Sequence, residues 1–504
     1  MSPPPSRSRT SHRPDPGRWR ILAILLTTIF MSLIGVSIVN VALPSIQTSL
    51  NATQSDIQWV LSGYALTFGV VLVAAGRAGD LMGRGGLFLI GVALFTLSSI
   101  AAGLAPDAAW LNGARFVQGI GSGLLNPQGL GMIQHYFRGA ERGRAFGYFG
   151  TAVGFSVAIG PVLGGVLIEL GGLHLGWRLT FLVNVPIGIA VLILGLKWFP
   201  RPLIQLPSRT PAPVQRGGTP GAPPAARAGW RSLDPIGSLL LGLAVLSFLY
   251  PFVESRSAPL TWALLPLGLL LAALWVWWER RTVSRGGSPM VDLRIFATPS
   301  FSNGVLIMAL YFLGTTSVWV LVALYVQEGL DMSALQSGLF GIPAALLSSW
   351  AADWAGRRVM AYGRKIVIGG LFLALAGLGL SMGVILLQAY DLLSAWWLLL
   401  TLSFIGLAQG FVISPNQALT LMDVPLDYAG SSGAIMQTGQ RIGTSVGIAM
   451  ITATVFWTLD GSTSWHLATA TGFGVISVII VIALAFAYKD QRDRRKHEQA
   501  IIAN

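Results

Sequence analysis

The sequence contains no cysteine and very little charge. Only 11% of its 504 residues are Asp, Glu, Lys or Arg, whereas soluble domains carry about 25%. The absence of cysteine excludes disulfides, thiol catalysis and cysteine-based metal sites. No lysine follows a glycine, so the phosphate-binding loop of an ATP-driven pump is missing, and there is no His-Glu-x-x-His zinc motif. We therefore expect neither an enzyme nor a bound cofactor or metal.

Long apolar runs take the place of charge. Hydrophobic residues make up 53% of the chain, and the mean hydropathy is +0.66. A membrane-spanning helix needs about 20 mostly apolar residues. Reading for such runs predicts an all-α membrane protein with fourteen spans, near 21–43, 57–76, 86–105, 110–134, 145–170, 179–198, 236–253, 260–278, 302–327, 338–356, 366–387, 395–420, 431–459 and 467–488.

The basic residues gather on one side of these predicted spans. Of the 33 Lys and Arg residues, only Arg178 and Arg256 fall in predicted outer loops, and only Arg115 and Arg441 lie deep within spans. An excess of basic residues in cytoplasmic loops is typical of inner-membrane proteins. It explains the net charge of +13 without nucleic acid. We expect a multi-pass protein of the cell (inner, cytoplasmic) membrane with both termini in the cytoplasm.

Composition along the chain predicts six regions. The run that starts at Ile21 continues to about Leu43 without an Ala-x-Ala cleavage site, which favours an uncleaved first span over a signal peptide. The regions are a disordered cytoplasmic N-terminus (1–20), a six-helix bundle (21–199), a Pro/Gly-rich cytoplasmic linker (200–232), two inserted helices (233–300), a second six-helix bundle (301–488) and a cytoplasmic tail (489–504).

An internal repeat supports this division. Gly76-Arg77 and Gly83-Arg84 close the second predicted span, and Gly356-Arg357 and Gly363-Arg364 close the tenth at the same offset in sequence. Many transporters consist of two such repeats, with the substrate site between them near the membrane midplane. The inserted pair lies outside the repeat and is expected to be peripheral.

Seven short motifs lie in order on the predicted spans. They are 37–44 (SIVNVALP), 58–64 (QWVLSGY), 76–84 (GRAGDLMGR), 115–121 (RFVQGIG), 154–165 (GFSVAIGPVLGG), 176–178 (GWR) and 437–443 (QTGQRIG). Together they resemble the major facilitator superfamily, and within it the fourteen-span drug:proton antiporter family of the EmrB/QacA type. One departure concerns the first span, where the family usually carries an acidic residue linked with proton coupling and this chain has Gly35.

The resemblance implies a secondary active efflux transporter that works by alternating access and exchanges lipophilic or amphiphilic drugs for protons. Its expected partners are a small lipophilic substrate, protons and membrane lipid, without nucleic acid, and it is expected to be a monomer. Two alternatives stay open: a lipid or metabolite exporter on the same fold, and a transport-inactive membrane sensor or scaffold.

The loop after the second span predicts a cytoplasmic gate. The Asp80 carboxylate is expected to meet the N-terminus of the thirteenth span, near Gly430-Ser431, when the cytoplasmic side is shut, because a carboxylate complements the helix dipole there. The alternative is a static turn with a surface ion pair. Met360 stands at the equivalent place of the repeat, so such a gate is one-sided. The gate residues are Gly76, Asp80, Gly83 and Arg84.

Charged residues within spans are candidates for coupling, because a charge in the bilayer should face a cavity or a partner. Arg115 and Arg441 are two candidates, and each could instead be a structural arginine, with Arg115 bonded to carbonyl groups or to Gln118. Asp353 is the acidic candidate. It could instead lie at the cytoplasmic edge and pair with Arg357.

The stretch 154–165 resembles the antiporter signature of the superfamily. Proline removes a backbone donor, so Gly160-Pro161 should bend the fifth span. The glycines should form a smooth face for close helix packing that seals the cavity, with ordinary small-residue packing as the alternative. The motif residues are Gly154, Gly160, Pro161, Gly164 and Gly165. Candidates for the substrate cavity are Asn40, Tyr64, Gln118, Asn126, Gln409 and Gln437.

Overall fold

The computed structural model describes residues 17–204, 234–254, 259–285, 287, 289–332, 334–425, 428–462 and 464–503. Within these residues the backbone forms helices and turns, without any strand. A helix satisfies its backbone hydrogen bonds within one segment, which is what an apolar run requires in lipid. The predicted all-α class is confirmed for this part of the chain.

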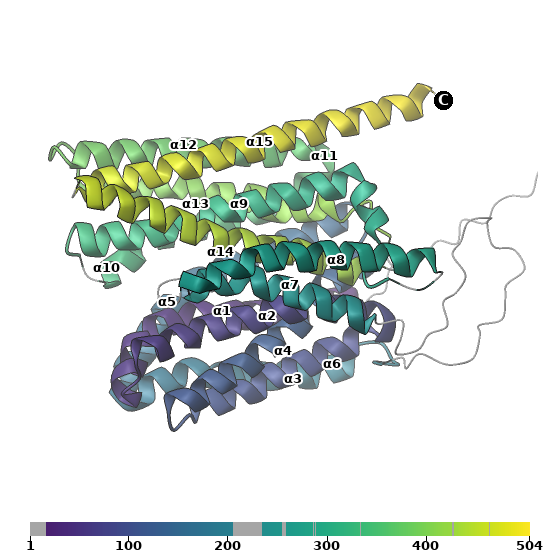
Figure 1. Cartoon of the computed structure of the whole chain (residues 1–504), viewed down its shortest axis with the longest axis horizontal. Helices are drawn as coiled ribbons and strands as arrows, with labels where there is room; N and C mark the ends of the chain where they lie inside the picture. The colour runs from purple at the N-terminus through teal and green to yellow at the C-terminus, as the bar shows by residue number, and fades with distance from the viewer. Residues whose placement is uncertain are drawn as a thin grey trace, which may run out of the picture.

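The N-terminal half packs as one group of helices. Figure 1 shows this group below and the C-terminal half above, with the helices of both running along the long axis. In the N-terminal half, α1 lies along α5, and α4 packs on both α2 and α3. Its helices are α1 (Arg18–Leu50), α2 (Gln54–Met82), α3 (Arg84–Gly103), α4 (Ala108–Tyr136), α5 (Gly139–Leu182) and α6 (Asn184–Trp198).

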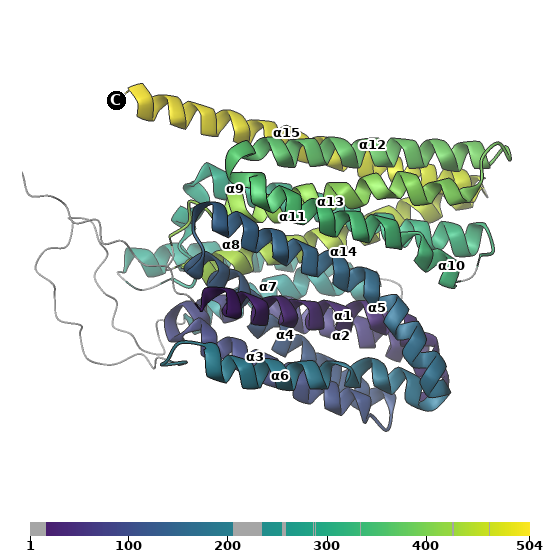
Figure 2. The ribbon, with the colours of Figure 1, turned by 180° about the vertical axis from the view of Figure 1, so that it is seen from behind.

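The C-terminal half repeats this pattern of packing. Here α13 packs on α11 and α12, while α9 packs on α14 and α15. Seen from behind, α5 of the first half lies beside α11 of the second (Figure 2). The helices are α9 (Pro299–Leu324), α10 (Ala334–Leu339), α11 (Gly341–Tyr362), α12 (Arg364–Gln388), α13 (Leu398–Thr420), α14 (Ala429–Ser462) and α15 (Trp465–Ala503), with short helical turns η4 (Tyr325–Gly329) and η5 (Ala395–Trp397).

Two helices connect the halves in sequence and lie over the seam between them. α7 (Pro235–Glu254) packs on α2 of one half and α14 of the other, and α8 (Leu264–Ser284) packs on α7 (Figure 1). Short turns η2 (Pro259–Ala263) and η3 (Leu293–Ala297) flank α8. The pair is peripheral, as the repeat predicts.

Eleven helical stretches in the described residues are long and apolar enough to cross a membrane. One of them, Gly139–Trp198, is 60 residues long and contains both α5 and α6. α4 and α11 are not among the eleven. α4 buries polar side chains such as Gln118 and Gln128, and α11 carries Asp353, Arg357 and Arg358. The exact count of fourteen spans therefore stays a prediction.

The ends of the predicted regions need small corrections. Residues 1–16 and 205–233 lie outside the described residues, but α1 already begins at Arg18, within the N-terminus predicted to be disordered. An ion pair of 2.7 Å between Arg18 and Glu141 ties this first turn to α5. At the other end of the chain, α15 continues as a helix through the predicted tail to Ala503.

Candidate functional site

The carboxylate of Asp80, close to the end of α2, joins the two halves. Its Oδ1 accepts a hydrogen bond from the backbone N–H of Gly430 at 2.9 Å, and its Oδ2 accepts from the N–H and the hydroxyl of Ser431, both at 2.9 Å. These residues form the first turn of α14, so the carboxylate meets the positive end of a helix dipole. The contact that the sequence predicts between Asp80 and Gly430-Ser431 is present.

Arg84 completes this arrangement. Its Nη2 and Nε donate to Oδ1 of Asp80 at 2.9 and 3.1 Å. Because the Asp80 side chain is only 1% exposed, this is not the surface ion pair of the alternative interpretation. We call Asp80, Arg84, Gly430 and Ser431 the latch, and the end of the bundle where they lie the latch end.

Two glycines allow the latch to form. A Cβ on Gly76 would lie 2.7 Å from the carbonyl oxygen of Gly430, so only glycine permits this approach of α2 to α14. Gly83 has a φ of 105° and turns the chain from α2 into α3, which brings Arg84 back to Asp80. The four predicted gate residues are thus brought together.

Other contacts between the halves lie near the latch and along the middle of α5 and α11. Thr151 of α5 donates to the carbonyl oxygen of Ser349 at 2.9 Å, and Gln134 of α4 donates to the carbonyl oxygen of Leu421 at 3.1 Å. α5 and α11 approach so closely that a Cβ on Gly356 would lie 2.4 Å from Cα of Gly147. Gln134, Gly147 and Gly356 belong to the parts of their helices nearer the latch, whereas Ser349 lies near the middle of α11, on the side away from the latch.

The repeat of the latch is built differently. Arg364, the counterpart of Arg84, is buried and donates from Nε to Oδ2 of Asp490 at 2.6 Å. Asp490 lies on α15, in the same half as Arg364, and it also accepts from Arg494 at 3.0 Å. Met360, the counterpart of Asp80, is 45% exposed. The repeat arginine therefore joins helices within one half, which agrees with a one-sided gate.

Neutral groups hold Arg115, which is 1% exposed. Its Nε donates to the carbonyl oxygen of Val60 at 2.8 Å, and its Nη1 donates to Oε1 of Gln118 at 2.5 Å. Its guanidinium carbon lies 4.3 Å from the centre of the Tyr64 ring. This arrangement is the structural alternative that the sequence left open for Arg115, and it brings together three of the predicted site residues.

Arg441 lies between the halves, at mid-depth. It belongs to α14 and is half-buried, and its guanidinium carbon lies 4.3 Å from the centre of the Phe68 ring. Phe68 stands midway along α2 of the other half. Arg441 forms no side-chain hydrogen bond or ion pair with any residue that the structure describes. Among the described residues, its closest contact for the charge is the face of the Phe68 ring.

Asp353 pairs with Arg357. Its Oδ2 forms an ion pair of 2.7 Å with Arg357, one helical turn further along α11, and the Asp353 side chain is 29% exposed. Because both partners lie on the same helix, a movement of the two halves does not separate this carboxylate from its arginine. The pairing with Arg357 that the sequence left open is therefore present, and the coupling role of Asp353 stays a prediction.

The glycines of the antiporter stretch divide between two neighbours. A Cβ on Gly160 would overlap the Ser37 hydroxyl of α1, and a Cβ on Gly164 would lie 2.9 Å from Ile38. Gly154 faces α11 instead, where a Cβ on Gly154 would lie 2.7 Å from Oγ of Ser349. A Cβ on Gly165 would meet nothing within 4 Å, so Gly165 is not part of the packing face. At Pro161 the backbone stays helical, and the break in α5 comes later, at Gly172, with φ 64°.

The predicted cavity residues differ in their burial and partners. Tyr64 and Gln118 are buried, with the Tyr64 hydroxyl 2.7 Å from Oγ of Ser122. Asn126 donates to the Ser122 carbonyl at 3.0 Å. Asn40 is exposed, Gln409 is half-buried and Gln437 is 8% exposed.

Gly35, where the family acid is expected, is buried. A Cβ there would lie 3.3 Å from the Phe95 ring and 3.6 Å from Nδ2 of Asn184. The environment of this position is therefore an aromatic ring and a neutral amide, rather than water or a charged partner.

Sequence reasoning missed a pair of buried acids on the inserted helices. Asp234 accepts from the Trp278 indole at 2.8 Å, and Glu279 accepts from the backbone N–H of Met290 at 3.1 Å. One oxygen of each carboxylate, Oδ2 of Asp234 and Oε1 of Glu279, is buried without a hydrogen-bond partner. Glu279 lies directly at the end of a predicted span. An acidic residue close to lipid is costly, and its presence there was the feature of the sequence that could have indicated a buried acid.

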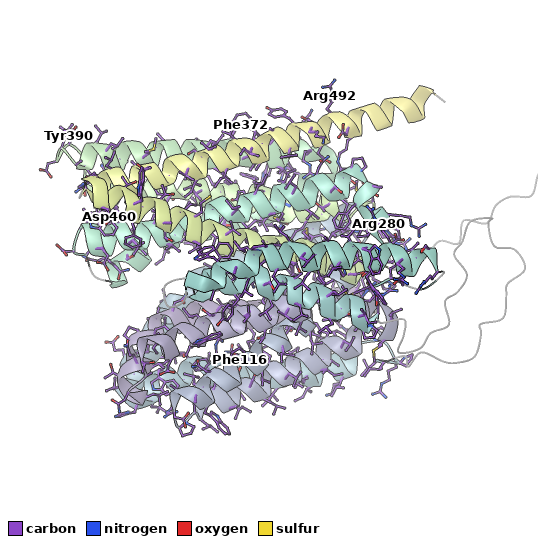
Figure 3. All side chains as sticks on the ribbon, in the orientation of Figure 1. Phe116, Arg280, Phe372, Tyr390, Asp460 and Arg492 are labelled. Carbon is purple, nitrogen blue, oxygen red and sulfur yellow. The ribbon has the colours of Figure 1, made fainter. Side chains whose placement is uncertain are left out.

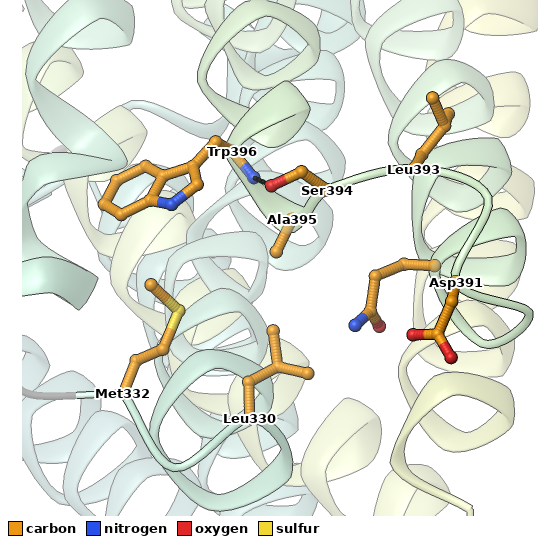
Figure 4. A pocket seen from close by; sticks show the side chains of 8 residues that line it. Leu330, Met332, Asp391, Leu393, Ser394, Ala395 and Trp396 are labelled. Carbon is orange, nitrogen blue, oxygen red and sulfur yellow. Dashed lines mark hydrogen bonds between the residues drawn. The ribbon is translucent and has the colours of Figure 1, made fainter.

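A surface cavity of about 480 Å³ lies at the end opposite the latch (Figure 4). The only ionisable group in its lining, Asp391, is exposed. None of the predicted substrate residues lines it. Its lining residues are Leu330, Met332, Gln388, Asp391, Leu393, Ser394, Ala395 and Trp396.

Comparison with known proteins places this chain in a family. Residues 25–448 match the family model of the Major Facilitator Superfamily. The chain is 31% identical to a probable actinorhodin transporter of Streptomyces coelicolor, over 91% of this chain and 76% of that protein. It is 30% identical to the puromycin resistance protein pur8 of Streptomyces alboniger, over 99% and 96%. The crystal structure of the human organic anion transporter MFSD10 shares the fold, with a TM-score of 0.66, 13% identity and coverage of 94% and 100%.

Proposed function

Because the chain belongs to the major facilitator superfamily, we propose that it is a secondary active transporter that exports lipophilic and amphiphilic compounds in exchange for protons. The names of its relatives, a probable actinorhodin transporter and a puromycin resistance protein, support export of such compounds. The observation that carries the proposal is the latch, a set of hydrogen bonds that connects the two halves through the carboxylate of Asp80.

The latch acts as the gate in this proposal. Alternating access requires that one end of the bundle opens while the other closes. Most of the described hydrogen bonds between the halves lie near the latch, which supports a state closed at that end. A hydrogen bond to a charged group such as a carboxylate contributes about 1.5–3 kcal/mol to stability. That strength holds a gate and still lets it open.

The latch end faces the cytoplasm in this proposal. Arg280 and Arg492 lie at that end and Asp460 at the other (Figure 3). Basic residues on the cytoplasmic side fit the known bias of membrane proteins. With α4, α11 and both parts of Gly139–Trp198 counted as spans, the chain crosses the cell membrane fourteen times as a monomer of the EmrB/QacA type, and both termini are cytoplasmic.

The test is transport by the purified full chain in inside-out proteoliposomes with an imposed pH gradient. The panel contains puromycin and several lipophilic dyes of either charge. We expect uptake of some compounds when the lumen is acidic and none after the gradient is collapsed. Uptake that ignores the gradient contradicts proton exchange, and a panel that never moves contradicts export altogether.

A further inference from the structure

The middle of the molecule carries positive charge that no acid neutralises. The ion pairs of the described residues all lie toward the latch end, and neither Arg115 nor Arg441 takes part in them; the arginines that do are Arg18, Arg84, Arg294, Arg357, Arg364 and Arg494. An arginine deep in a span costs about 2.5–3.5 kcal/mol even on lenient scales and is found where it faces a partner or a functional site.

The two arginines lie against neighbouring aromatic rings. The Arg115 guanidinium lies 4.3 Å from the Tyr64 ring centre, and the Arg441 guanidinium lies 4.3 Å from the Phe68 ring centre. The two rings, one helical turn apart on α2, have centres 6.1 Å apart. Both arginines therefore add their positive potential to the same part of the seam.

The two arginines differ in what remains available for a ligand. Arg115 is buried and already donates to Val60 and Gln118. Arg441 is half-buried and donates to no described residue. A guanidinium presents five N–H donors in a planar fork that matches a carboxylate or a sulfonate. Arg441 can thus accept an anionic group without giving up an existing hydrogen bond.

The position of Arg441 is that of a substrate contact. It lies on the C-terminal half and stacks on a residue midway along a helix of the N-terminal half. In transporters built from repeats, substrates bind near this depth at the interface of the repeats. An aromatic wall continues toward the inserted helices, because Trp59 of α2 lies 5.9 Å from the Phe116 ring and 6.1 Å from the Tyr250 ring of α7.

We propose that Arg441 binds the anionic group of an amphiphilic substrate, so that the transporter prefers organic anions with an apolar or aromatic body over cations of the same shape. The proposal rests on the export function above and specifies its substrate class. A cation at this site would meet the unneutralised charges of Arg441 and Arg115, whereas an anion gains a charge-assisted hydrogen bond in a partly dehydrated setting.

The experiment uses three probes that share a pyrene body, namely 1-pyrenebutyrate, 1-pyrenebutanol and 1-pyrenebutylammonium. Binding to the full chain in nanodiscs at pH 7 is followed by energy transfer from tryptophan to pyrene. We expect the wild-type chain to bind pyrenebutyrate at least tenfold more tightly than pyrenebutanol, and pyrenebutylammonium most weakly. Arg441→Gln should abolish the preference for the anion and leave pyrenebutanol binding within twofold. Arg441→Lys should keep part of the preference.

A matched control replaces an arginine in the same kind of contact elsewhere. Arg281→Gln removes a guanidinium that lies 4.9 Å from the Trp277 ring on the peripheral helix α8, and it should leave all three affinities unchanged. Equal binding of the three probes by the wild-type chain overturns the proposal. So does a loss in Arg441→Gln that is equal for the anion and the alcohol, because that would be a structural effect.

Failure of the export proposal is recognised separately. If no compound of the panel moves in proteoliposomes while anion binding still depends on Arg441, the anion site stands and export fails. If compounds are exported but the preference for pyrenebutyrate is missing, export stands and the anion site fails.

Discussion

Replacement of Asp80 by Asn tests the gate most directly, because each described group around this carboxylate is a donor. Gly430, Ser431 and Arg84 all donate to its two oxygens. An asparagine keeps one oxygen but turns the other position into an NH₂ group, which faces donors and cannot accept from them. The variant therefore loses the charge and at least one hydrogen bond between the halves.

The expected size of the effect follows from these contacts. A hydrogen bond to a charged group contributes about 1.5–3 kcal/mol, and a partly buried carboxylate at a helix N-terminus gains up to ~2 kcal/mol from the dipole. Allowing for overlap between the two effects, we expect the state closed at the latch end to lose about 2 kcal/mol. That corresponds to a shift of roughly 30-fold in the equilibrium between the two states.

The chain is suited to measuring this shift, because it has no cysteine that would compete for a spin label. Cysteines introduced at Ala140 and Met360 place labels on exposed positions of α5 and α11, on opposite halves at the latch end. Electron–electron resonance then reports the distance between the halves. We expect one short distance in the wild-type background and a dominant longer distance in Asp80→Asn, together with slower export.

Asp56→Asn is the matched control for this prediction. The Asp56 carboxylate also accepts hydrogen bonds at a helix N-terminus, from the N–H of Thr53 at 2.9 Å, but its described partner is the cap residue of its own helix rather than a residue of the other half. Thr53 donates to this carboxylate and thereby lowers the pKa of Asp56. The control should leave the label distances unchanged. Distances that stay the same in Asp80→Asn as well would refute the latch as a gate.

Two further variants test packing and buried charge. Gly160→Ala should slow exchange and lower the thermal stability in detergent, since its methyl group overlaps the Ser37 side chain; Gly165→Ala should be silent, and Ser37→Gly should rescue Gly160→Ala. Asp490→Asn should destabilise the chain by about 3–5 kcal/mol in thermal unfolding, because it leaves Arg364 charged and buried without its partner. Thermal stability that is unchanged by Asp490→Asn would contradict a structural role for that ion pair.

Much of the fold could be predicted because few backbone structures are stable in lipid. An apolar run of sufficient length forms a helix, and each long helix of the structure overlaps a run that the sequence shows. The contact of Asp80 with Gly430-Ser431 was also predictable, although the residues are far apart in sequence. It depended on a carboxylate at a glycine-rich turn and on a resemblance that placed the turn beside the thirteenth span.

Other parts of the site depended on how each helix is rotated about its axis. Composition could not tell that Arg364 pairs with Asp490 on α15, that Asp353 pairs on its own helix, or that Gly165 faces open space. Spans that are apolar on all sides show too little periodicity to reveal which face meets a neighbour. The same limit applied to the acids Asp234 and Glu279.

The sequence by itself determined that this chain is a helical membrane protein, where its helices lie, and which charges are too deep to be accidental. Only the tertiary structure decided which of those charges are satisfied. Arg115 donates hydrogen bonds to Val60 and Gln118, whereas Arg441 lies against the ring of Phe68 and donates to no residue that the structure describes. The reason is physical: a buried charge is defined by the groups that surround it in space, and those groups come from helices whose mutual orientation is set by packing.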